Sequence, residues 1–502
     1  MAGIGVQLNK IFGRRTITSS LYGVGFSFTY TIAPMLAVIG CLLAMFKLLQ
    51  FDTVGYIERE TFSCSILYIF IFSLLTAAPF NSVLSKYQTD RIYERRYEDI
   101  RPCIYVGTIT NLTLSTLLAV PFCIYAVVVG EIEVYYIFTA FMGYLGCTLT
   151  FATMVYNSIL KQYKRISVYF ICSMLLTLGL SLLFHYIFRF TITYSMLLAL
   201  SLGFLLIASL ELSNVLRYFP ANSCKYREVL HYYRIYWKLI ASNFLYAFGL
   251  FVHNFVFWAQ PWHLVVRSTF VCNQPYDMAS SLAMFTNISA SVFFISRVEM
   301  HFHERYRGYM EAVIGGKLET IEKTKQRMFQ GLSSQLLSLV HLQFLVSVVA
   351  YFIAIGILPT MGFSGLTMEI YPQLAVGFFI SFLMYSELLF LYYFDDRTGA
   401  MINGIIFAGV SLAGSVLASQ FSAIWYGTGF TAAAFLAFTF SFFRLRWIER
   451  NIDNLIFCRG TLIKQVNEQM PKADVYNVYT GALGAELLTE TASAATQATT
   501  IK

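Results

Sequence analysis

Long apolar stretches follow one another along almost the whole chain, and they constrain its fold more than any other feature. A helix that crosses a bilayer needs about 20 apolar residues, and a hydropathy window of about 19 residues places twelve such stretches. They lie near residues 20–46, 61–84, 103–129, 134–159, 166–188, 192–216, 237–259, 278–296, 332–358, 373–394, 400–420 and 424–443. Only 12% of the 502 residues are charged, against about 25% in ordinary soluble domains. The pattern predicts an all-α integral membrane protein with twelve transmembrane helices, and it excludes a soluble domain and a nucleic-acid binder.

The distribution of lysine and arginine predicts the orientation of these spans. If the N-terminus is cytoplasmic, 31 of the 35 lysine and arginine residues fall on the cytoplasmic side. The outer side then holds only Lys47, Arg59, Arg189 and Arg267. Positive charge accumulates in the cytoplasmic loops of membrane proteins, and an even number of spans returns the chain to the side where it began. We therefore predict that both termini are cytoplasmic.

The twelve spans divide into two groups of six that resemble each other weakly. Residues 21–25 in the first span read LYGVG, and residues 245–249 in the seventh read LYAFG. Six spans per group give a parallel repeat, and transporters commonly place their substrate path between such repeats. We predict four parts: an N-terminal six-helix half (1–216), a cytoplasmic linker (217–236), a C-terminal six-helix half (237–444) and a partly disordered cytoplasmic tail (445–502).

The chain lacks the usual signatures of catalysis and of cofactor binding. It contains no Walker A loop, and Asp395-Asp396 falls in a turn too short for a sugar-nucleotide domain. The nine cysteines form no CxxC pair, and most of them lie in apolar runs, where free cysteine behaves as a small hydrophobic residue. We therefore expect no enzymatic activity, no cofactor, no metal site and no disulfide.

Polar groups inside the predicted spans are candidates for function, because a charge within the bilayer is costly. Glu387 lies about eight residues inside the turn that follows its span; it could titrate a proton, line a path or only bond a neighbouring helix. His253 and Asn254 follow the repeated element of the seventh span, and Asn243 lies about three turns earlier on roughly the same face. These groups could line a path or form a packed polar cluster. Glu211 is expected to extend toward the bilayer interface.

The repeated element itself predicts a conduit between the two halves, which are expected to meet along the first and seventh spans. Glycine there permits close helix approach, and tyrosine offers a stacking face and a hydroxyl group. Neutral polar groups suit a sliding polymer, because fixed charges would hold a charged chain. The predicted conduit residues are Tyr22, Thr29, Tyr30, Asn243, Tyr246, His253, Asn254 and Glu387.

Two basic cytoplasmic segments, 86–101 and 297–331, occur at equivalent points of the two halves. In the second segment an apolar stripe at helical spacing comprises Val298, Phe302, Tyr306, Tyr309 and Val313. The stripe predicts either a helix lying on the membrane surface or a docking surface for a cytoplasmic partner. The residues predicted to dock the partner are Arg95, Arg96, Arg305 and Arg307.

Several short motifs together resemble the PelG family of Pel exopolysaccharide exporters over about residues 1–460. They are MAGIG at 1–5, AAP at 77–79, DRIYERRY at 90–97, Phe257-Trp258, Tyr276-Asp277, RVE at 297–299, YYFD at 392–395 and FCR at 457–459. One departure concerns the seventh span, where the family carries an Asp-Lys pair just before its Phe-Trp. This sequence has His253 and Asn254 at those positions, which removes an ion pair from that place.

The resemblance implies a fold of the multidrug/oligosaccharidyl-lipid/polysaccharide (MOP) exporter type, similar to MATE transporters. It implies transport of an amino-sugar-rich, partially cationic polysaccharide across the cytoplasmic membrane in biofilm formation. The implied partners are the cytoplasmic glycosyltransferase PelF, the cyclic-di-GMP receptor PelD and the membrane protein PelE. With no nucleotide motif, export would be driven by polymer elongation or by an ion gradient acting on Glu387.

The residues leave other functions open. A lipid-linked oligosaccharide flippase or a drug exporter would have the same fold and would need a cavity open to lipid. An integral-membrane sugar or acyl transferase would need a catalytic constellation at a membrane surface, which the sequence does not offer. A structural scaffold would not account for the repeat.

Overall fold

The computed structural model describes residues 17–160, 163–286, 298, 300–357, 359 and 364–459. For residues 17–32 it describes the helix but not the side chains. The chain forms two compact units, Met1–Leu445 and Arg446–Lys502. The described part contains fourteen α-helices, three 3-10 turns and one two-stranded hairpin, so helices dominate the fold as predicted.

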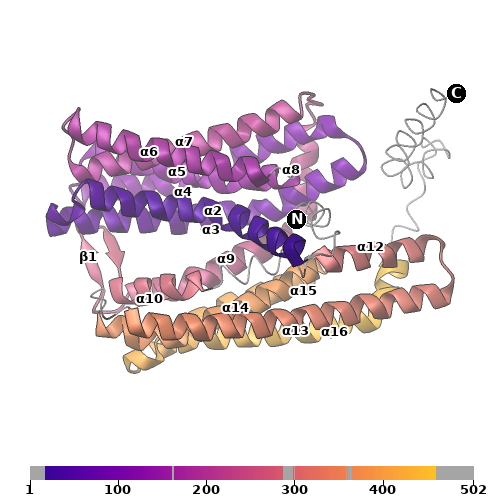
Figure 1. The fold of residues 1–502 in the computed structure, drawn as a ribbon. Coiled ribbons are helices and arrows are strands. Elements are labelled where there is room, and N and C mark those ends of the chain that lie inside the picture. The colour runs from indigo at the N-terminus through magenta and orange to yellow at the C-terminus, as the bar shows by residue number, and fades with distance from the viewer. Residues whose placement is uncertain are drawn as a thin grey trace. The chain divides into compact units, whose positions relative to one another are not determined.

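The first group of helices contains six long apolar segments that run side by side (Figure 1). They are α2 (Ile17–Leu48), α3 (Tyr56–Tyr93), α4 (Ile100–Val128), α5 (Val134–Ile159), α6 (Tyr163–Tyr186) and α7 (Ile192–Tyr218). Helix α5 packs against α3, α4 and α7, while α6 packs against α2 and α7. Two 3-10 turns, η1 (Phe51–Thr53) and η2 (Tyr97–Asp99), connect successive helices. A short helix, α8 (Tyr226–Ile235), follows the group and packs on α3 and α4.

The second group begins with α9, which packs along α15. Its helices are α9 (Trp237–Trp258), α10 (Gln274–Phe285), α12 (Met300–Gly315), α13 (Leu318–Ile357), α14 (Gly365–Tyr393), α15 (Arg397–Ala418) and α16 (Thr428–Arg459), with the 3-10 turn η4 (Ala423–Trp425). Between α9 and α10, strands β1 (Leu264–Val266) and β2 (Phe270–Cys272) form an antiparallel hairpin with Val265 opposite Val271. The hairpin lies at the end of the helices away from α8 and α12 (Figure 1).

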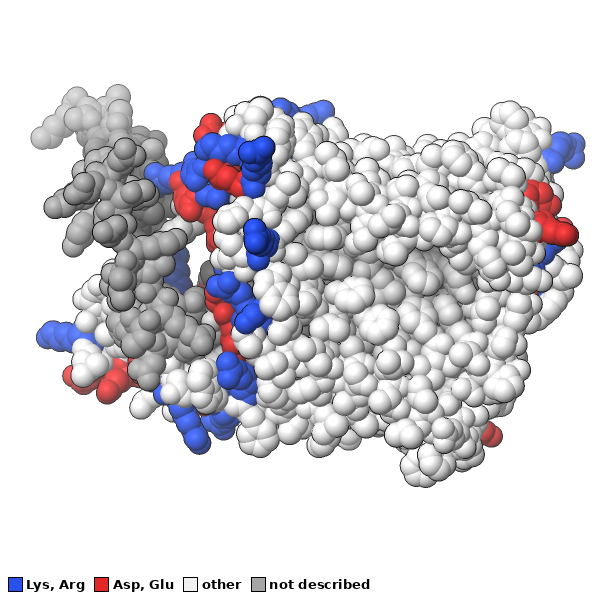
Figure 2. Space-filling model, turned by 180° about the vertical axis from the view of Figure 1, so that it is seen from behind, with Lys and Arg blue, Asp and Glu red and all other residues white. Residues whose placement is uncertain are grey.

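Ten described helices are long and apolar enough to cross a membrane, namely α3–α7, α9 and α13–α16. The first predicted span falls on α2, whose segment Ala33–Leu48 is a shorter apolar helix. The eighth begins in α10 and continues into residues outside the description. Figure 2 shows one face of the molecule, on which charged side chains gather at the two ends and uncharged residues cover the surface between them. The predicted all-α membrane fold is confirmed.

The apolar stripe of the second basic segment packs inside the protein. Val298, Phe302 and Tyr309 are buried, and the Phe302 ring lies edge-on to Phe390 at 4.7 Å and to Tyr393 at 5.4 Å between centroids. The prediction of a membrane-surface helix at this place is therefore wrong, because the end of α14 already covers the apolar face of α12.

Candidate functional site

Two stacked ring pairs join the first group of helices to the second. Tyr68 on α3 stacks on Trp258 on α9 with 5.1 Å between ring centroids and 6° between planes. One turn further along α3, Phe72 stacks on Phe255 at 5.9 Å and 11°. Residues three or four positions apart share a helix face, so this spacing aligns both pairs along one line of contact between α3 and α9.

The hairpin is hydrogen-bonded to α3 at Tyr68, one of the stacked residues. The Tyr68 hydroxyl donates a hydrogen bond to the Val271 carbonyl at 2.7 Å and accepts one from the Val271 N–H at 3.0 Å. The Phe270 ring lies edge-on to Tyr68 at 5.2 Å. Tyr68 therefore bonds to β2 and stacks on α9 at once.

The opposite end of α3 also contacts the second group. Lys86 lies 3.7 Å from Asp395 in the turn between α14 and α15. One turn before Lys86 on α3, Ser82 accepts a hydrogen bond from the side-chain amide of Asn243 on α9. Asn243 in turn accepts a hydrogen bond from the Tyr392 hydroxyl at 3.0 Å. The described residues thus place the contact between the groups on the second and seventh spans.

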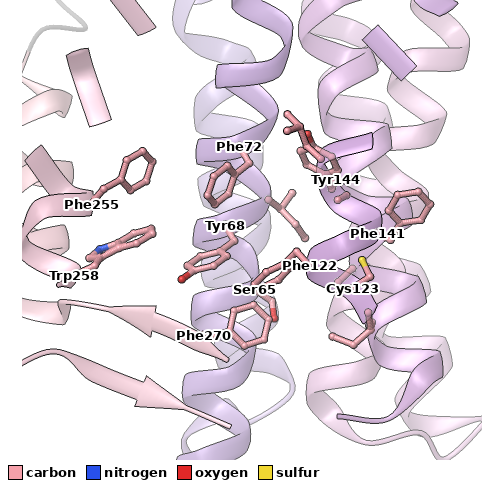
Figure 3. A pocket seen from close by; sticks show the side chains of 15 residues that line it. Ser65, Tyr68, Phe72, Phe122, Cys123, Phe141, Tyr144, Phe255, Trp258 and Phe270 are labelled. Carbon is pink, nitrogen blue, oxygen red and sulfur yellow. The ribbon is translucent and has the colours of Figure 1, made fainter. Parts of the chain in front are cut away.

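A cavity of about 600 Å³ lies beside the stacked rings, between α3, α4, α5, α9 and β2. Eight of its fifteen lining residues are aromatic; α4 and α5 contribute Phe122, Phe141 and Tyr144. Figure 3 shows Phe255 and Trp258 facing Tyr68 and Phe72, with Phe141 and Tyr144 on the far side of the α3 rings. The lining that the structure describes contains no charged side chain. Its volume falls within the range of about 300–1,000 Å³ typical of ligand pockets.

A buried carboxylate adjoins this cavity through the indole of Trp258. The indole Nε1 donates to both oxygens of Asp277 at 3.0 Å, the Asn254 amide donates at 2.7 Å, and the Asn273 N–H donates at 3.0 Å. The sequence marks Asp277 only as part of the motif Tyr276-Asp277. Its donors lie on α9 and at the start of α10, and the Asn273 side chain caps α10 by accepting the Tyr276 N–H. Such a cap followed by an acid in the first turn is the signal that could have directed attention to Asp277.

Three of the predicted conduit residues pack within the second group. His253 is buried, shares a 2.8 Å hydrogen bond with the Tyr276 hydroxyl and lies 4.5 Å from the Phe430 ring. The Tyr246 ring stacks on Tyr385 at 4.9 Å and 25°. Asn254, also buried, donates a hydrogen bond from its neutral amide to Asp277. A lining role for these residues stays a prediction.

The other predicted conduit residues are placed differently. Asn243 lies between the two groups, as described above. Glu387 is buried in α14, and its Oε2 accepts no hydrogen bond from the residues that the structure describes. Tyr22, Thr29 and Tyr30 belong to the part of α2 whose side chains lie outside the description.

Of the predicted docking arginines, those of the first segment differ in their surroundings. Arg96 lies 2.7 Å from Asp99, 3.4 Å from Glu94 and 3.6 Å from Glu228 of α8, so its charge is balanced within the chain. Arg95 is exposed and has a positive φ of 58°. The local turn therefore exposes Arg95, while Arg96 connects to α8 through its ion pair with Glu228.

The arginines of the second segment also differ. Arg305 lies over Gly331 of α13, where a Cβ atom would overlap its guanidinium group. Arg307 is exposed and pairs with Glu311 one turn further along α12 at 2.8 Å. Docking by these four arginines is still a prediction; Arg95, Arg305 and Arg307 are exposed, and Arg96 is half-buried.

Two other acidic side chains, Glu211 and Asp396, form bonds within the protein. Glu211 is fully buried and accepts a hydrogen bond from Thr153 at 2.6 Å, so the expectation that it extends to the interface is wrong. Thr153 on the neighbouring helix α5 bonds the Oε2 atom of Glu211, while Oε1 is buried and accepts no hydrogen bond from the residues that the structure describes. Asp396 accepts the Gly399 N–H at the start of α15 and pairs with Arg444, whose Nη2 lies 3.0 Å from it. Asp396 therefore caps helix α15 and forms an ion pair with the Arg444 side chain.

The two groups of membrane helices, with a cavity at their contact, have the fold of solved MATE transporters. A multidrug resistance MATE transporter in an outward-facing conformation is 14% identical, with a TM-score of 0.54 over 85% of this chain and 96% of that chain. The MATE transporter ClbM in complex with Rb⁺ is 13% identical, with a TM-score of 0.57 over 86% of this chain and 96% of that chain. At these identities the likeness concerns the fold.

The family follows from the sequence. The PelG family profile, described as an exopolysaccharide exporter (EPS-E), matches residues 1–457. The chain belongs to the PelG family, as its motifs predicted. No individually curated protein matches it in sequence.

Proposed function

We propose that this chain exports an amino-sugar-rich, partially cationic exopolysaccharide of the Pel type across the cytoplasmic membrane, with both termini in the cytoplasm. Its membership of an exopolysaccharide exporter family supports the substrate class. The excess of lysine and arginine at one end of the helices supports the orientation. The observation that carries the proposal is the uncharged aromatic cavity between α3, α4, α5 and α9.

The chemistry of the cavity suits a chain of sugar rings. Aromatic faces pack well against flat apolar surfaces, and pyranose rings present such faces of C–H groups. Attraction between a cation and an aromatic face is worth about 0.5–1 kcal/mol where it is solvated, which is weak enough for an amino-sugar polymer to move on. A carboxylate in the lining would bind such a polymer more tightly, and the described lining has none.

Replacing Phe141 with alanine tests the cavity directly. Phe141 lines it from α5, and its loss should reduce secreted polymer several-fold, measured as hexosamine released from the culture medium by acid hydrolysis. Phe352→Ala is the matched control, because that ring is 68% exposed on α13. Membrane levels of both variants are measured by immunoblot. Equal secretion by the two variants at equal membrane levels would contradict a cavity-based path.

We further propose that export is coupled to synthesis by PelF docked at the basic end of the helices, with PelD and PelE, in biofilm formation. The exposed Arg95 and Arg307 support a docking surface at this end. Changing both to glutamate should release PelF in co-purification. Arg189→Glu, on the predicted outer side, is the control. Retention of PelF by the double variant would place the docking surface elsewhere.

The predicted conduit residues are proposed to line the path when the two groups of helices separate. Single cysteines at positions 22, 246, 253 and 254, in a background without native cysteines, should then react with water-soluble thiol reagents in secreting cells. If all four stay unreactive in both resting and secreting cells, these residues serve packing.

One observation favours a second candidate function, the movement of a lipid-linked oligosaccharide. A hollow of about 320 Å³ between α4 and α5 shares Cys123, Ile137 and Phe141 with the aromatic cavity. Its rim carries exposed apolar residues, Val128 and Val134 among them, so a lipid chain could occupy it while sugar occupies the cavity. Translocation of a polyprenyl-phosphate-linked sugar in proteoliposomes would favour this function over polymer export.

A further inference from the structure

Two cysteines from distant parts of the chain meet beside the aromatic cavity. The Sγ atoms of Cys64 on α3 and Cys272 at the end of β2 lie 3.1 Å apart, although 208 residues separate them in the sequence. Both are free thiols, 2% and 4% exposed. By contrast, the Cys41 thiol donates to the Met174 carbonyl, and Cys103 contacts the Gln88 amide and the Leu84 carbonyl.

We propose that Cys64 and Cys272 form a disulfide that ties α3 to the β1–β2 hairpin. The neighbouring contacts hold the two sulfurs in place for it: one turn along α3, Tyr68 makes two hydrogen bonds to Val271, the residue before Cys272. Strand pairing of Cys272 with Leu264 further restrains the hairpin. The thiols therefore meet without rearrangement of either element.

The location favours oxidation. The hairpin lies at the end of the helices away from α8 and α12 (Figure 1), and the nearby cations Arg59 and Arg267 belong to the few on the predicted outer side. Outside the cytoplasm disulfides form and persist. This step rests on the orientation given under the proposed function.

The reaction is a thiol–disulfide exchange with a disulfide oxidant such as oxidised glutathione. The Cys272 thiolate attacks one sulfur of the oxidant and forms a mixed disulfide with it, while the oxidant's S–S bond breaks and its other sulfur leaves as a thiolate that takes up a proton. The Cys64 thiolate then attacks the Cys272 sulfur of that mixed disulfide and releases the second thiol. Two protein thiols are oxidised to one disulfide, and one oxidant disulfide is reduced to two thiols. Because both sulfurs are buried in the closed contact, the first step takes place when the hairpin lifts from α3.

Such a bond would join the two groups of helices covalently. Cys64 belongs to the first group and Cys272 follows α9 of the second, and the bond lies one turn from the stacked pair Tyr68–Trp258. Any transport cycle that separates α3 from α9 at this end would stop while the bond exists and resume after reduction.

Formation of the bond is tested on the purified full-length protein, independently of transport. The protein is treated with oxidised glutathione and denatured, and its free thiols are tagged with a polyethylene glycol maleimide and counted by gel shift. The wild type should lose two tags and Cys272→Ser none, while Cys64→Ser should lose at most one, as an unresolved mixed disulfide at Cys272. The control Cys172→Ser, which removes an exposed cysteine, should again lose two. Peptide mapping should identify the linked pair 64–272. An equal loss of tags in Cys64→Ser, or no loss in the wild type, would overturn the proposal.

The effect on transport is a separate readout. In cells, oxidant should lower polymer secretion several-fold in the wild type and in Cys172→Ser, reversibly by dithiothreitol, and leave Cys272→Ser unaffected. If the disulfide forms in the gel assay but oxidant leaves polymer secretion unchanged, the bond exists and the proposed block of transport is wrong. An absent disulfide in cells with normal secretion would overturn the bond and leave the export function standing.

Discussion

Replacing Trp258 with phenylalanine removes one N–H group and keeps an aromatic ring in the contact between α3 and α9. The indole Nε1 donates to both carboxylate oxygens of Asp277 at 3.0 Å. Both side chains are buried, with 8% and 6% exposure. After the substitution Asp277 retains only the donors from the Asn254 amide and the Asn273 N–H. The variant therefore removes one buried hydrogen-bond donor to the carboxylate and replaces the indole by a smaller ring.

The expected loss of stability follows from this geometry. A hydrogen bond to a charged group contributes about 1.5–3 kcal/mol, and the smaller ring leaves a cavity that adds about 1 kcal/mol. Trp258→Phe should thus lower the free energy of unfolding by about 2.5–4 kcal/mol. Trp258→Ala also loses the stacking on Tyr68, and large-to-small aromatic changes alone cost about 3–5 kcal/mol. Its total loss should therefore exceed that of the phenylalanine variant.

Reversible unfolding by sodium dodecyl sulfate in mixed micelles, followed by circular dichroism, measures these free energies. A double-mutant cycle with Asp277→Ala should give a coupling energy of about 1.5–3 kcal/mol between positions 258 and 277. Trp425→Phe is the control, because that side chain is 54% exposed and surface substitutions stay within about 0.5 kcal/mol. A Trp258→Phe variant as stable as this control, or a coupling energy near zero, would refute the reasoning.

Two further predictions concern α14 and the contact between α15 and α16. If a proton gradient drives export, Glu387→Gln should abolish polymer secretion at normal membrane levels while the exposed Glu369→Gln, on the same helix, secretes normally; normal secretion by Glu387→Gln would instead favour polymer elongation as the driving force. Gly429→Ala should lower the free energy of unfolding by about 1–3 kcal/mol, because its Cβ would overlap the backbone of Gly414. Gly409→Ala, where a Cβ meets nothing within 4 Å, should leave it unchanged in the same unfolding assay, and equal stability of the two variants would contradict this close approach.

The membrane fold was predictable because its main determinant is local. The bilayer requires about 20 apolar residues in a row, and such a run can be recognised from consecutive residues alone. The spans expected near 192–216 and 400–420 agree with α7 (Ile192–Tyr218) and α15 (Arg397–Ala418) to within about three residues at each end. The family was likewise recognisable from short motifs spread over the chain.

The surroundings of individual polar groups were less predictable, since they depend on which helices are neighbours. Glu211 was expected at the interface, yet it is buried in the interior, where Thr153 on the adjacent α5 bonds one of its carboxylate oxygens. The stripe through Phe302 was read correctly as one face of a helix, but its partner on α14 could not be inferred from spacing. Helical periodicity shows which residues share a face and leaves open what that face meets.

The sequence by itself determined that this chain is a helical membrane protein of the PelG family, and it predicts that most of the positive charge lies on one side of the membrane. Only the tertiary structure decided which residues form the contact between the two groups of helices. Tyr68 and Trp258 are 190 residues apart, and Cys64 and Cys272 are 208 residues apart. No local pattern links such positions, because their proximity depends on how α3, α9 and the hairpin pack together after each has formed.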